Sequence, residues 1–432
     1  MGTMIKSLIA VLLGTLSALA QAGPRIEHWT APSGARVYFI ESRVVPIVDI
    51  QIDFAAGGAY VPASKAGLAG LTRGLLDMGA GEFDEEKIAD RLADVGAVLG
   101  GGADQDRASI SLRSLSSARE REAALELMRL VLQQPVFPAA VLDREKTRTI
   151  AGIREADTRP ASIAAKRFAA ALYPGHPYGR VPTVESVEKV ARDDLVAFYR
   201  AHYGARRAIV SIIGDLSRAE AEAIGQRLTE GLPDAPPDGG LPDARLPARE
   251  TLRIDHPATQ AHIHLGLPAV RRGDPDYFPL LVGNYILGGG GFVSRLMKEV
   301  REKRGYAYSV YSYFQPLKQP GPFQIGLQTK REQAAEALKV VEDVLAEFLA
   351  RGPGEEELKA ARRNLADGFP LRIDSNRKLL DYLSVIGFYG LPLTYLDDFP
   401  RKVEAVTAAD IRAAFARHVK PEHFVTVIVG GE

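Results

Sequence analysis

Two segments half a chain apart repeat one pattern, and this repeat constrains the fold more than any other feature of the sequence. Residues 190–215 and 406–431 align without a gap at an offset of 216 residues, which pairs His202 with His418. Each segment has helical apolar spacing followed by an apolar run that ends in glycine. Because the chain has 432 residues, the offset is half its length and indicates a duplicated domain.

A linker separates the two copies. Residues 233–248 are rich in proline, glycine and aspartate and have little apolar periodicity, a composition typical of connecting segments. The sequence therefore predicts a first domain at residues 24–232 and a second at residues 249–432.

Each copy has the pattern of an α+β domain. Alternation of apolar and polar side chains, typical of half-solvated antiparallel strands, occurs over residues 48–54, 108–115, 261–267 and 323–329. Helical spacing occurs in the first copy over residues 66–78, 84–95, 118–133, 138–157 and 161–172. Because helices and strands do not alternate strictly, we expect two homologous α+β domains, each an antiparallel sheet flanked by helices.

The N-terminus has the pattern of a secretory signal peptide over residues 1–22. Lys6 precedes an apolar run at residues 8–20, and Ala20 and Ala22 fit the small-x-small rule for cleavage. The run is short for a membrane span, and an uncleaved anchor is the alternative. We therefore expect an exported mature protein without a membrane span, most simply a periplasmic one.

The charge balance and the lack of cysteine exclude several classes of function. The sequence has 54 lysines and arginines, 54 aspartates and glutamates, and no cysteine. A balanced charge gives no basic excess for nucleic acid. Without cysteine the chain has no disulfides, thiolate zinc sites or cysteine nucleophiles.

Two glycines one turn apart in an amphipathic helix are an unexpected local feature. In the sequence KAGLAGLTRGLLDMG of residues 65–79, Gly70 and Gly74 share a helical face, and Arg73 lies between them in the sequence. Each glycine in a helix interior costs about 1 kcal/mol relative to alanine. The pair raises the question of which side chains this face could have carried.

Four stretches together resemble the pitrilysin/insulinase family of inverted zinc metallopeptidases, which includes the mitochondrial processing peptidase and the core proteins of the cytochrome bc1 complex. The stretches are GLAGLTRGLLDMG, HPYGRVPTVESVEKVARDDLVAFYRAHY, LGGGGFVSRLMKEVREKRGYAYSVYS and VTVIVGG, and they follow the family order. The resemblance implies a pair of α+β domains in this chain. It also implies that two such pairs close around an unfolded peptide.

The resemblance indicates what the two glycines replace. Active members carry H-x-x-E-H on this helix, where two histidines bind zinc and the glutamate activates a water molecule. In this sequence the three positions hold Gly70, Arg73 and Gly74. Glycine has no donor atom, and we expect the positive charge of Arg73 to lie where a cation would sit and to repel it.

The third zinc ligand of the family is a glutamate on a later helix. It falls near Ala151 and Gly152 in this sequence, with Glu155 one turn away. Because neither alanine nor glycine can donate to a metal, we expect this chain to hold no metal or cofactor of its own, and zinc to be held by a partner subunit.

The histidines give weaker signals. His262 and His264 share one face of a strand, but two histidines without a third ligand seldom form a zinc site, so we interpret them as exposed or hydrogen-bonded residues of a sheet. His176 lies in a Pro/Gly loop without a partner acid or base nearby in the sequence. His202 and His418 lie at equivalent positions near helix ends, which favours a structural role.

Arg301 and Tyr308, seven residues apart, match a pair that the family uses to contact the substrate backbone and the reacting carbonyl from the domain opposite the zinc. A guanidinium and a phenol can stabilise the negative charge that develops on such an oxygen, by about 2–4 kcal/mol for each donor. From spacing alone, an ordinary surface charge and a strand aromatic would be the better interpretation of the two residues, and it is the resemblance that favours the substrate role.

A run of four glycines precedes this pair, formed by Gly288, Gly289, Gly290 and Gly291. It does not match a nucleotide-binding loop. The resemblance implies contact with substrate, because a glycine-rich loop in this region handles substrate in the non-catalytic subunit of the processing peptidase. The alternative is a flexible turn between elements.

The sequence therefore favours a non-catalytic, substrate-binding subunit of a heterodimeric periplasmic zinc metalloendopeptidase that degrades unfolded peptides. A homologous zinc-bearing subunit would supply H-x-x-E-H, and Arg301 and Tyr308 would complete its active site. The alternative is a structural or binding protein of the same fold, like the bc1 core proteins. A self-sufficient peptidase with another metal site is disfavoured because the expected donors are missing.

Overall fold

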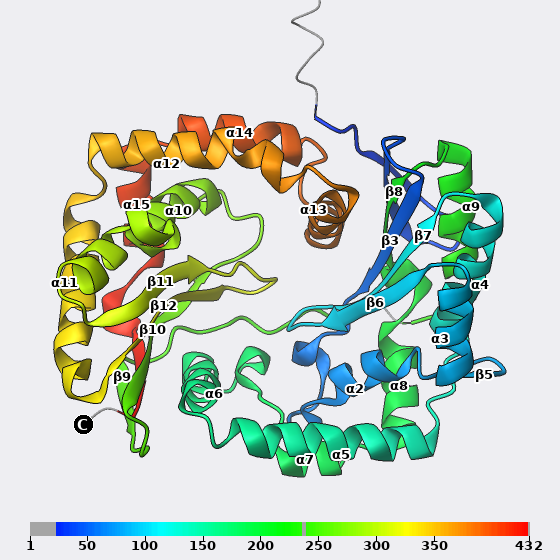
Figure 1. Cartoon of the computed structure of the whole chain (residues 1–432), viewed down its shortest axis with the longest axis horizontal. Coiled ribbons are helices and arrows are strands. Elements are labelled where there is room, and N and C mark those ends of the chain that lie inside the picture. Colours follow the sequence, from blue (N-terminus) through cyan, green and yellow to red (C-terminus); the bar gives the residue numbers. More distant parts are fainter. Residues whose placement is uncertain (1–22, 236–238, 431–432) are drawn as a thin grey trace, which may run out of the picture.

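The computed structural model describes residues 23–235 and 239–430, which form two lobes that lie side by side (Figure 1). The expected signal peptide, residues 1–22, lies outside the described residues. Each lobe contains a mainly antiparallel sheet with helices against it, which confirms the α+β class. Within the described ranges, no helix has both the length and the apolar character needed to cross a bilayer.

The sheet of the first lobe has six strands in the order β1-β2-β8-β3-β7-β6. Strand β8 runs parallel to β2, and the other neighbouring strands are antiparallel. Strand β6 forms an exposed edge of this sheet. The strands are β1 (Glu27–Thr30), β2 (Arg36–Glu41), β3 (Ile47–Phe54), β6 (Val98–Ala103), β7 (Ala108–Leu115) and β8 (Ile209–Gly214), and a separate short hairpin joins β4 (Gly79–Ala80) to β5 (Phe83–Asp84).

The sheet of the second lobe has five strands in the order β11-β12-β10-β13-β9. Here β13 runs parallel to β9, and the other pairs are antiparallel. Strands β11 and β9 are its two edge strands. The strands are β9 (Glu250–Ile254), β10 (Gln260–Val270), β11 (Ala307–Phe314), β12 (Gly321–Lys330) and β13 (Val425–Val429).

The helices agree with the apolar spacing of the sequence. Every helix and strand range expected above is present, and its ends differ by at most three residues from the expectation. The first-lobe sequence forms α2 (Leu68–Leu75), α3 (Glu85–Asp94), α4 (Ala118–Gln133), α5 (Ala139–Ala156), α6 (Pro160–Leu172), α7 (Val184–Glu188), α8 (Arg192–His202) and α9 (Arg218–Thr229). The second forms α10 (Tyr277–Asn284), α11 (Ala334–Arg351), α12 (Glu355–Asp367), α13 (Asn376–Tyr389), α14 (Tyr395–Ala405) and α15 (Ala408–His418).

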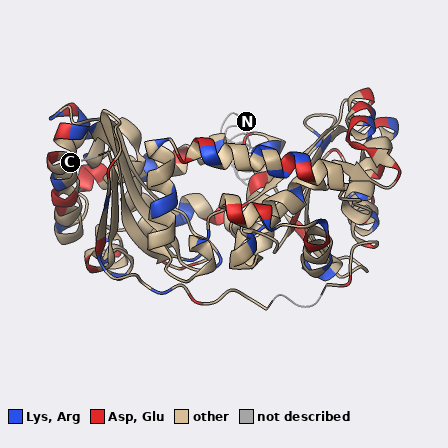
Figure 2. Ribbon diagram, turned by 90° about the horizontal axis from the view of Figure 1, so that it is seen from below, with Lys and Arg blue, Asp and Glu red and all other residues tan. Residues whose placement is uncertain are grey.

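The repeat seen in the sequence reappears as matched local structure. Asp194 and Asp410 each accept a hydrogen bond from the backbone N–H of the N-cap residue, at 2.8 Å and 2.9 Å, and so begin α8 and α15 in the same way. Each helix leads into a buried strand, β8 or β13. The described part of the expected linker contains no helix or strand and passes from one lobe to the other along one side of the molecule (Figure 2).

The two halves exchange one helix each. Helix α6, from the first half of the sequence, packs on β10 and β13 of the second sheet, and α13, from the second half, packs on β8 and β3 of the first sheet (Figure 1). The two helices begin at residues 160 and 376, which differ by the repeat offset of 216. Each sheet therefore depends on the other half of the chain to cover one of its faces.

Apolar side chains hold the exchanged helices in place. On α6, Phe168 and Leu172 are buried in one cluster with Val427 of the second sheet. On α13, Gly387 lies so close to the first sheet that a Cβ there would be 2.6 Å from the Ile209 side chain. Full burial of one large apolar side chain contributes about 1.5–3 kcal/mol to the free energy of unfolding. The buried contacts of the two exchanged helices therefore stabilise the packing of both lobes.

Buried polar contacts fix the register of the exchange. Asp53 on β3 is fully buried and accepts a hydrogen bond from the Ser384 hydroxyl of α13 at 2.6 Å. Arg107 donates to the same hydroxyl at 2.6 Å and lies 3.6 Å from the Asp53 carboxylate. Burial raises the pKa of Asp53, and Arg107 partly offsets that effect. Removing any one of these groups would take a hydrogen-bond or ion-pair partner from the other two inside the protein.

His264 lies beneath the exchanged helix α6. Its ring centroid is 5.7 Å from that of Phe168, and its Nδ1 lies 2.7 Å from the side-chain nitrogen of Gln324. Burial, and to a smaller extent the neighbouring His262, lower the pKa of His264 to about 4. The folded protein therefore keeps this imidazole neutral in mildly acidic solution.

We expect this burial to make the protein less stable in mild acid. An unfolded histidine takes up a proton below about pH 6.5, whereas folded His264 does not until about pH 4, so the free energy of unfolding falls as the pH is lowered through this window. Between about pH 7.5 and pH 5 the His264 contribution to that fall is about 2 kcal/mol. Urea unfolding of the wild type and His264→Gln at both pH values measures it.

The control is Gln328→Asn, at an exposed residue of β12 in the same sheet that has no titratable group. This variant should keep the pH dependence of the wild type, and His264→Gln should lose about 2 kcal/mol of it. Equal pH dependence in all three proteins would contradict the assignment to His264.

Candidate functional site

The helix that resembles the zinc-binding helix is α2, and its glycines face open space. Gly70 is exposed and Gly74 is half-buried. A Cβ atom built on either glycine would have no neighbour within 4 Å. The packing of this chain therefore does not require glycine at these positions, and a larger side chain would fit at both.

Arg73 has a different role from the one expected. Its side chain is buried, and it donates hydrogen bonds to the carbonyl oxygens of Ser109 on β7 at 2.6 Å and Gly100 on β6 at 2.5 Å. A third contact, at 3.5 Å, joins it to Asp77. The charge does not stand free beside Gly70 and Gly74. It instead ties α2 to the edge of the first sheet.

A glycine in β6 makes room for this arginine. Gly101 has a φ of +125°, and a Cβ there would lie 2.0 Å from the Ser109 carbonyl oxygen and 2.9 Å from the Arg73 guanidinium. Only glycine readily adopts this positive φ. The backbone of β6 takes this conformation directly after Gly100, whose carbonyl oxygen accepts the hydrogen bond from Arg73. The glycines of β6 are visible in the sequence, but their contact with Arg73 on α2 could not be predicted from it.

The expected third ligand position lies on α5, which packs against α2. Ala151, Gly152 and Glu155 are all exposed, and a Cβ on Gly152 would also meet no atom within 4 Å. Glu155 lies 3.7 Å from Arg159 in an ion pair. The degenerate positions thus lie on two neighbouring helices and offer no donor at Gly70, Gly74 or Gly152.

The second candidate region, in the other lobe, is irregular. The region has two π-helical turns: Tyr285–Gly289, which includes the first two glycines of the run, and Met297–Glu302, which follows the run. Turns of this kind are rare and occur frequently at functional sites. A Cβ on Gly288 would lie 2.4 Å from the Ser312 hydroxyl, and one on Gly289 would lie 2.5 Å from the Asn284 amide.

The glycine run is therefore required in part by packing within the chain. Gly290 would likewise bring a Cβ within 2.6 Å of the Tyr285 carbonyl oxygen, and Gly291 has a positive φ of +61°. Beneath the run, Asn284 and Ser312 are buried and hydrogen-bonded to each other. The Ser312 hydroxyl donates to the side-chain oxygen of Asn284 at 2.7 Å. This pair anchors the loop to β11 and was not singled out from the sequence.

The structure brings Arg301, Tyr308 and the end of the glycine run together. The Arg301 guanidinium carbon lies 4.8 Å from the centroid of the Tyr308 ring and 4.8 Å from that of Phe292, which directly follows Gly291. Phe292 is 63% exposed and Tyr308 is 84% exposed. Phe292 was missed from the sequence, although an aromatic residue after a glycine run was a visible signal.

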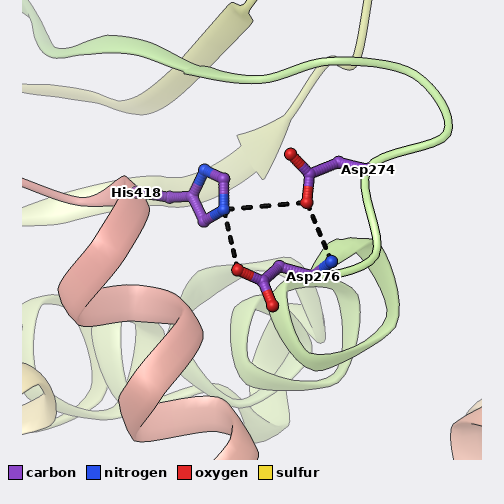
Figure 3. Close-up of side chains that lie close together, drawn as sticks. All are labelled: Asp274, Asp276 and His418. Carbon is purple, nitrogen blue, oxygen red and sulfur yellow. Dashed lines mark hydrogen bonds and ion pairs between the residues drawn. The ribbon is translucent and has the colours of Figure 1, made fainter.

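Asp274, Asp276 and His418 form a separate cluster in the second lobe that has the residue types of a metal site (Figure 3). His418 Nε2 lies 3.0 Å from an Asp276 oxygen and 3.8 Å from an Asp274 oxygen. However, Arg417 already binds both oxygens of Asp276 at 2.7 Å. A cation bound here would lie beside that guanidinium and be repelled by it.

The same histidine position in the first lobe supports a structural interpretation. His418 Nδ1 lies 2.9 Å from the Ala269 carbonyl oxygen, and its equivalent His202 lies 3.1 Å from that of Ala55. Both histidines therefore join the end of a helix to the sheet. His176 has its own structural contact, 2.9 Å from the Pro242 carbonyl oxygen, and burial lowers its pKa.

The protein resembles known proteins along nearly its whole length. Residues 189–365 match the family model described as the peptidase M16 inactive domain. The crystal structure of a peptidase M16 inactive domain from Pseudomonas fluorescens is 38% identical, with a TM-score of 0.91, and the match covers 94% of this chain and 98% of that chain.

Two curated relatives carry contrasting names. The non-peptidase homolog YmxG of Helicobacter pylori is 25% identical over 438 aligned positions, with 99% of each chain covered. An uncharacterized zinc protease of Mycobacterium tuberculosis is 27% identical over 409 positions, which cover 93% of this chain and 92% of that protein.

The open space at the degenerate positions predicts that alanine will stabilise the protein there. We expect Gly70→Ala and Gly152→Ala each to raise the free energy of unfolding by about 0.5–1 kcal/mol, because both lie in helices and a Cβ would clash with nothing. Urea unfolding measures the change. Gly101→Ala is the contrasting control and should destabilise the protein, and a loss of stability in the first two variants would contradict this interpretation.

The contacts of Arg73 predict a structural cost when they are removed. Arg73→Met keeps a long side chain but leaves two carbonyl oxygens without their charged donor, so we expect a loss of about 2–4 kcal/mol in unfolding free energy. Arg154→Met, an exposed arginine on α5, should change stability by less than about 0.5 kcal/mol. Equal effects of the two substitutions would show that the Arg73 contacts contribute little.

Proposed function

The chain belongs to the M16 peptidase family, to which its resemblance to pitrilysin and insulinase pointed, and we propose that it is a non-catalytic, peptide-binding subunit. It pairs with a homologous subunit that carries zinc and the H-x-x-E-H helix. One observation carries this proposal. The positions for zinc ligands have no donors, whereas Arg301, Tyr308 and the glycine run are still assembled on an exposed surface of the other lobe.

The first lobe supports the loss of catalysis. A hydrolytic zinc site needs three protein ligands and an open position for water. Gly70, Gly74 and Gly152 provide none of those ligands, and Arg73 is engaged with backbone carbonyls in place of an activating carboxylate. The name of the Helicobacter pylori relative, a non-peptidase homolog, is consistent with this view.

The sheet edges support binding of an extended peptide. Strand β6 is one edge of the first sheet and is exposed, and β11, which carries Tyr308, is one edge of the second. An edge strand offers unpaired backbone groups to which a peptide can add as a further strand. Unfolded peptides can adopt that extended form, whereas most segments of folded proteins cannot.

The surroundings expected for the mature protein follow from the N-terminal sequence. Residues 1–22 have the features of a cleaved signal, so the subunit and its partner work in the periplasm. Acidic and basic residues are interspersed over the helices of both lobes (Figure 2), which gives no single-sign surface for nucleic acid.

The proposal predicts that this chain contributes to the rate of its partner's reaction. In the reconstituted heterodimer, Arg301→Ala should lower kcat/KM for peptide cleavage by about 10²-fold, because a contact that positions the peptide for the partner's reaction is lost. Tyr308→Phe should give a smaller decrease, since only the hydroxyl is removed. Steady-state cleavage of an unfolded peptide measures both, with gel filtration to show that the dimer is intact.

The matched control is Arg363→Ala, an arginine at the exposed surface of α12, which should leave kcat/KM unchanged. Unchanged kinetics in all variants would contradict the proposed role of Arg301 and Tyr308. A purified complex without zinc in either chain would instead favour the structural alternative, in which the fold is kept for its surfaces.

A further inference from the structure

We propose that Arg301, held between Phe292 and Tyr308, binds a carboxylate group of the peptide. This inference rests on the proposed peptide-binding role and names the group that is recognised. The carboxylate can be the C-terminus of the peptide or an aspartate or glutamate side chain. Both sources present the same pair of oxygens to the guanidinium.

Aromatic contacts leave the N–H groups of Arg301 able to donate to a ligand. Its guanidinium carbon lies over two aromatic rings, 4.8 Å from the centroid of each. The contact of a guanidinium with a ring face uses its positive charge and none of its N–H donors, which lie in the plane of the group. A carboxylate that approaches along this edge forms two parallel hydrogen bonds, whereas a single backbone carbonyl accepts fewer.

Within the described residues, the donors of Arg301 are not used. Its guanidinium has no hydrogen bond or ion pair there, and neither has the Tyr308 hydroxyl. Two of the neighbouring cations behave differently. Lys303 and Arg304 both bind Glu299, at 2.6 Å and 2.8 Å.

The contrast extends to the start of the same segment, where Arg295 binds Glu357 at 2.6 Å. In the sequence, Arg301 thus lies between Arg295 and Arg304, which are both paired with glutamates. Arg301 itself contacts two aromatic rings and no acid among the described residues. The rings fix its orientation without supplying a negative charge, so its charge stays available to a ligand. Such an arrangement lowers the entropy lost when the ligand binds.

The two rings also indicate what accompanies the carboxylate. Phe292 and Tyr308 are among the most exposed aromatic residues of the described chain, at 63% and 84%, and Val293 beside them is 58% exposed. Large exposed apolar groups that lie together mark interaction sites on soluble proteins. We therefore expect an apolar side chain next to the carboxylate in the peptides that bind most tightly.

Four labelled peptides of one extended, leucine-containing sequence test the inference. The first has a free C-terminus and no acidic residue, and the second is the same peptide amidated. The third is amidated and carries one internal glutamate, and the fourth has glutamine in its place. Fluorescence anisotropy with the purified full-length mature chain gives Kd for each, at low and at high salt.

At least one acid should bind about tenfold or more tightly than its uncharged match, because a hydrogen-bonded charge pair is gained. Arg301→Gln should abolish this ratio, and Arg301→Lys should restore only part of it, since lysine keeps the charge but not the planar fork. Arg304→Gln, whose side chain is bound to Glu299, should keep the full ratio.

The outcomes separate the inference from the proposed function. If all four peptides bind equally, carboxylate recognition is wrong and peptide binding stands. The same conclusion follows if Arg301→Gln keeps the acid preference. If no peptide binds at all, both the inference and the proposed peptide-binding role are overturned. The pair that differs identifies the source, the C-terminus or an acidic side chain.

Discussion

The exchange of α6 and α13 is the constraint on which the rest of the structure depends. Each sheet has one face that is covered by a helix from the other half of the sequence. Neither half can therefore cover both faces of its own sheet. The two lobes must fold together so that each receives its helix from the other half. Buried Asp53, Arg107 and Ser384 add a geometric requirement, because their hydrogen bonds form only when α13 is in register. The lobes consequently hold the degenerate zinc positions and the Arg301 surface in a fixed relation.

This architecture explains why the fold does not need metal donors in the first lobe. The core is formed by sheets and exchanged helices, whereas Gly70, Gly74 and Gly152 face open space and contribute no packing. Arg73, on the same helix as Gly70 and Gly74, bonds to β6 and β7 and so contributes to stability.

The sequence predicted the features that depend on local periodicity, and the structure confirmed the fold class and the ranges of its elements. It also placed Arg301, Tyr308 and Gly291 in one region. In the structure Arg301 contacts Tyr308 and Phe292, and Phe292 directly follows Gly291. Helix exchange was not predictable, because α6 has the same apolar spacing whichever sheet it covers. The direction of Arg73 was also hidden, since it depends on the turned backbone of β6, a strand distant in the sequence.

The contrast between the two lobes is itself an argument for a retained binding role. Around the glycine run the chain keeps two π-helical turns, a positive φ at Gly291 and three glycines that admit no side chain. Turns of the π type are rare and occur frequently at functional sites, and large exposed aromatic residues such as Phe292 and Tyr308 carry a risk of aggregation. A protein kept only for its fold would gain by losing those two exposed rings. Their presence beside Arg301, which makes no hydrogen bond or ion pair within the described residues, is explained when that surface binds a ligand.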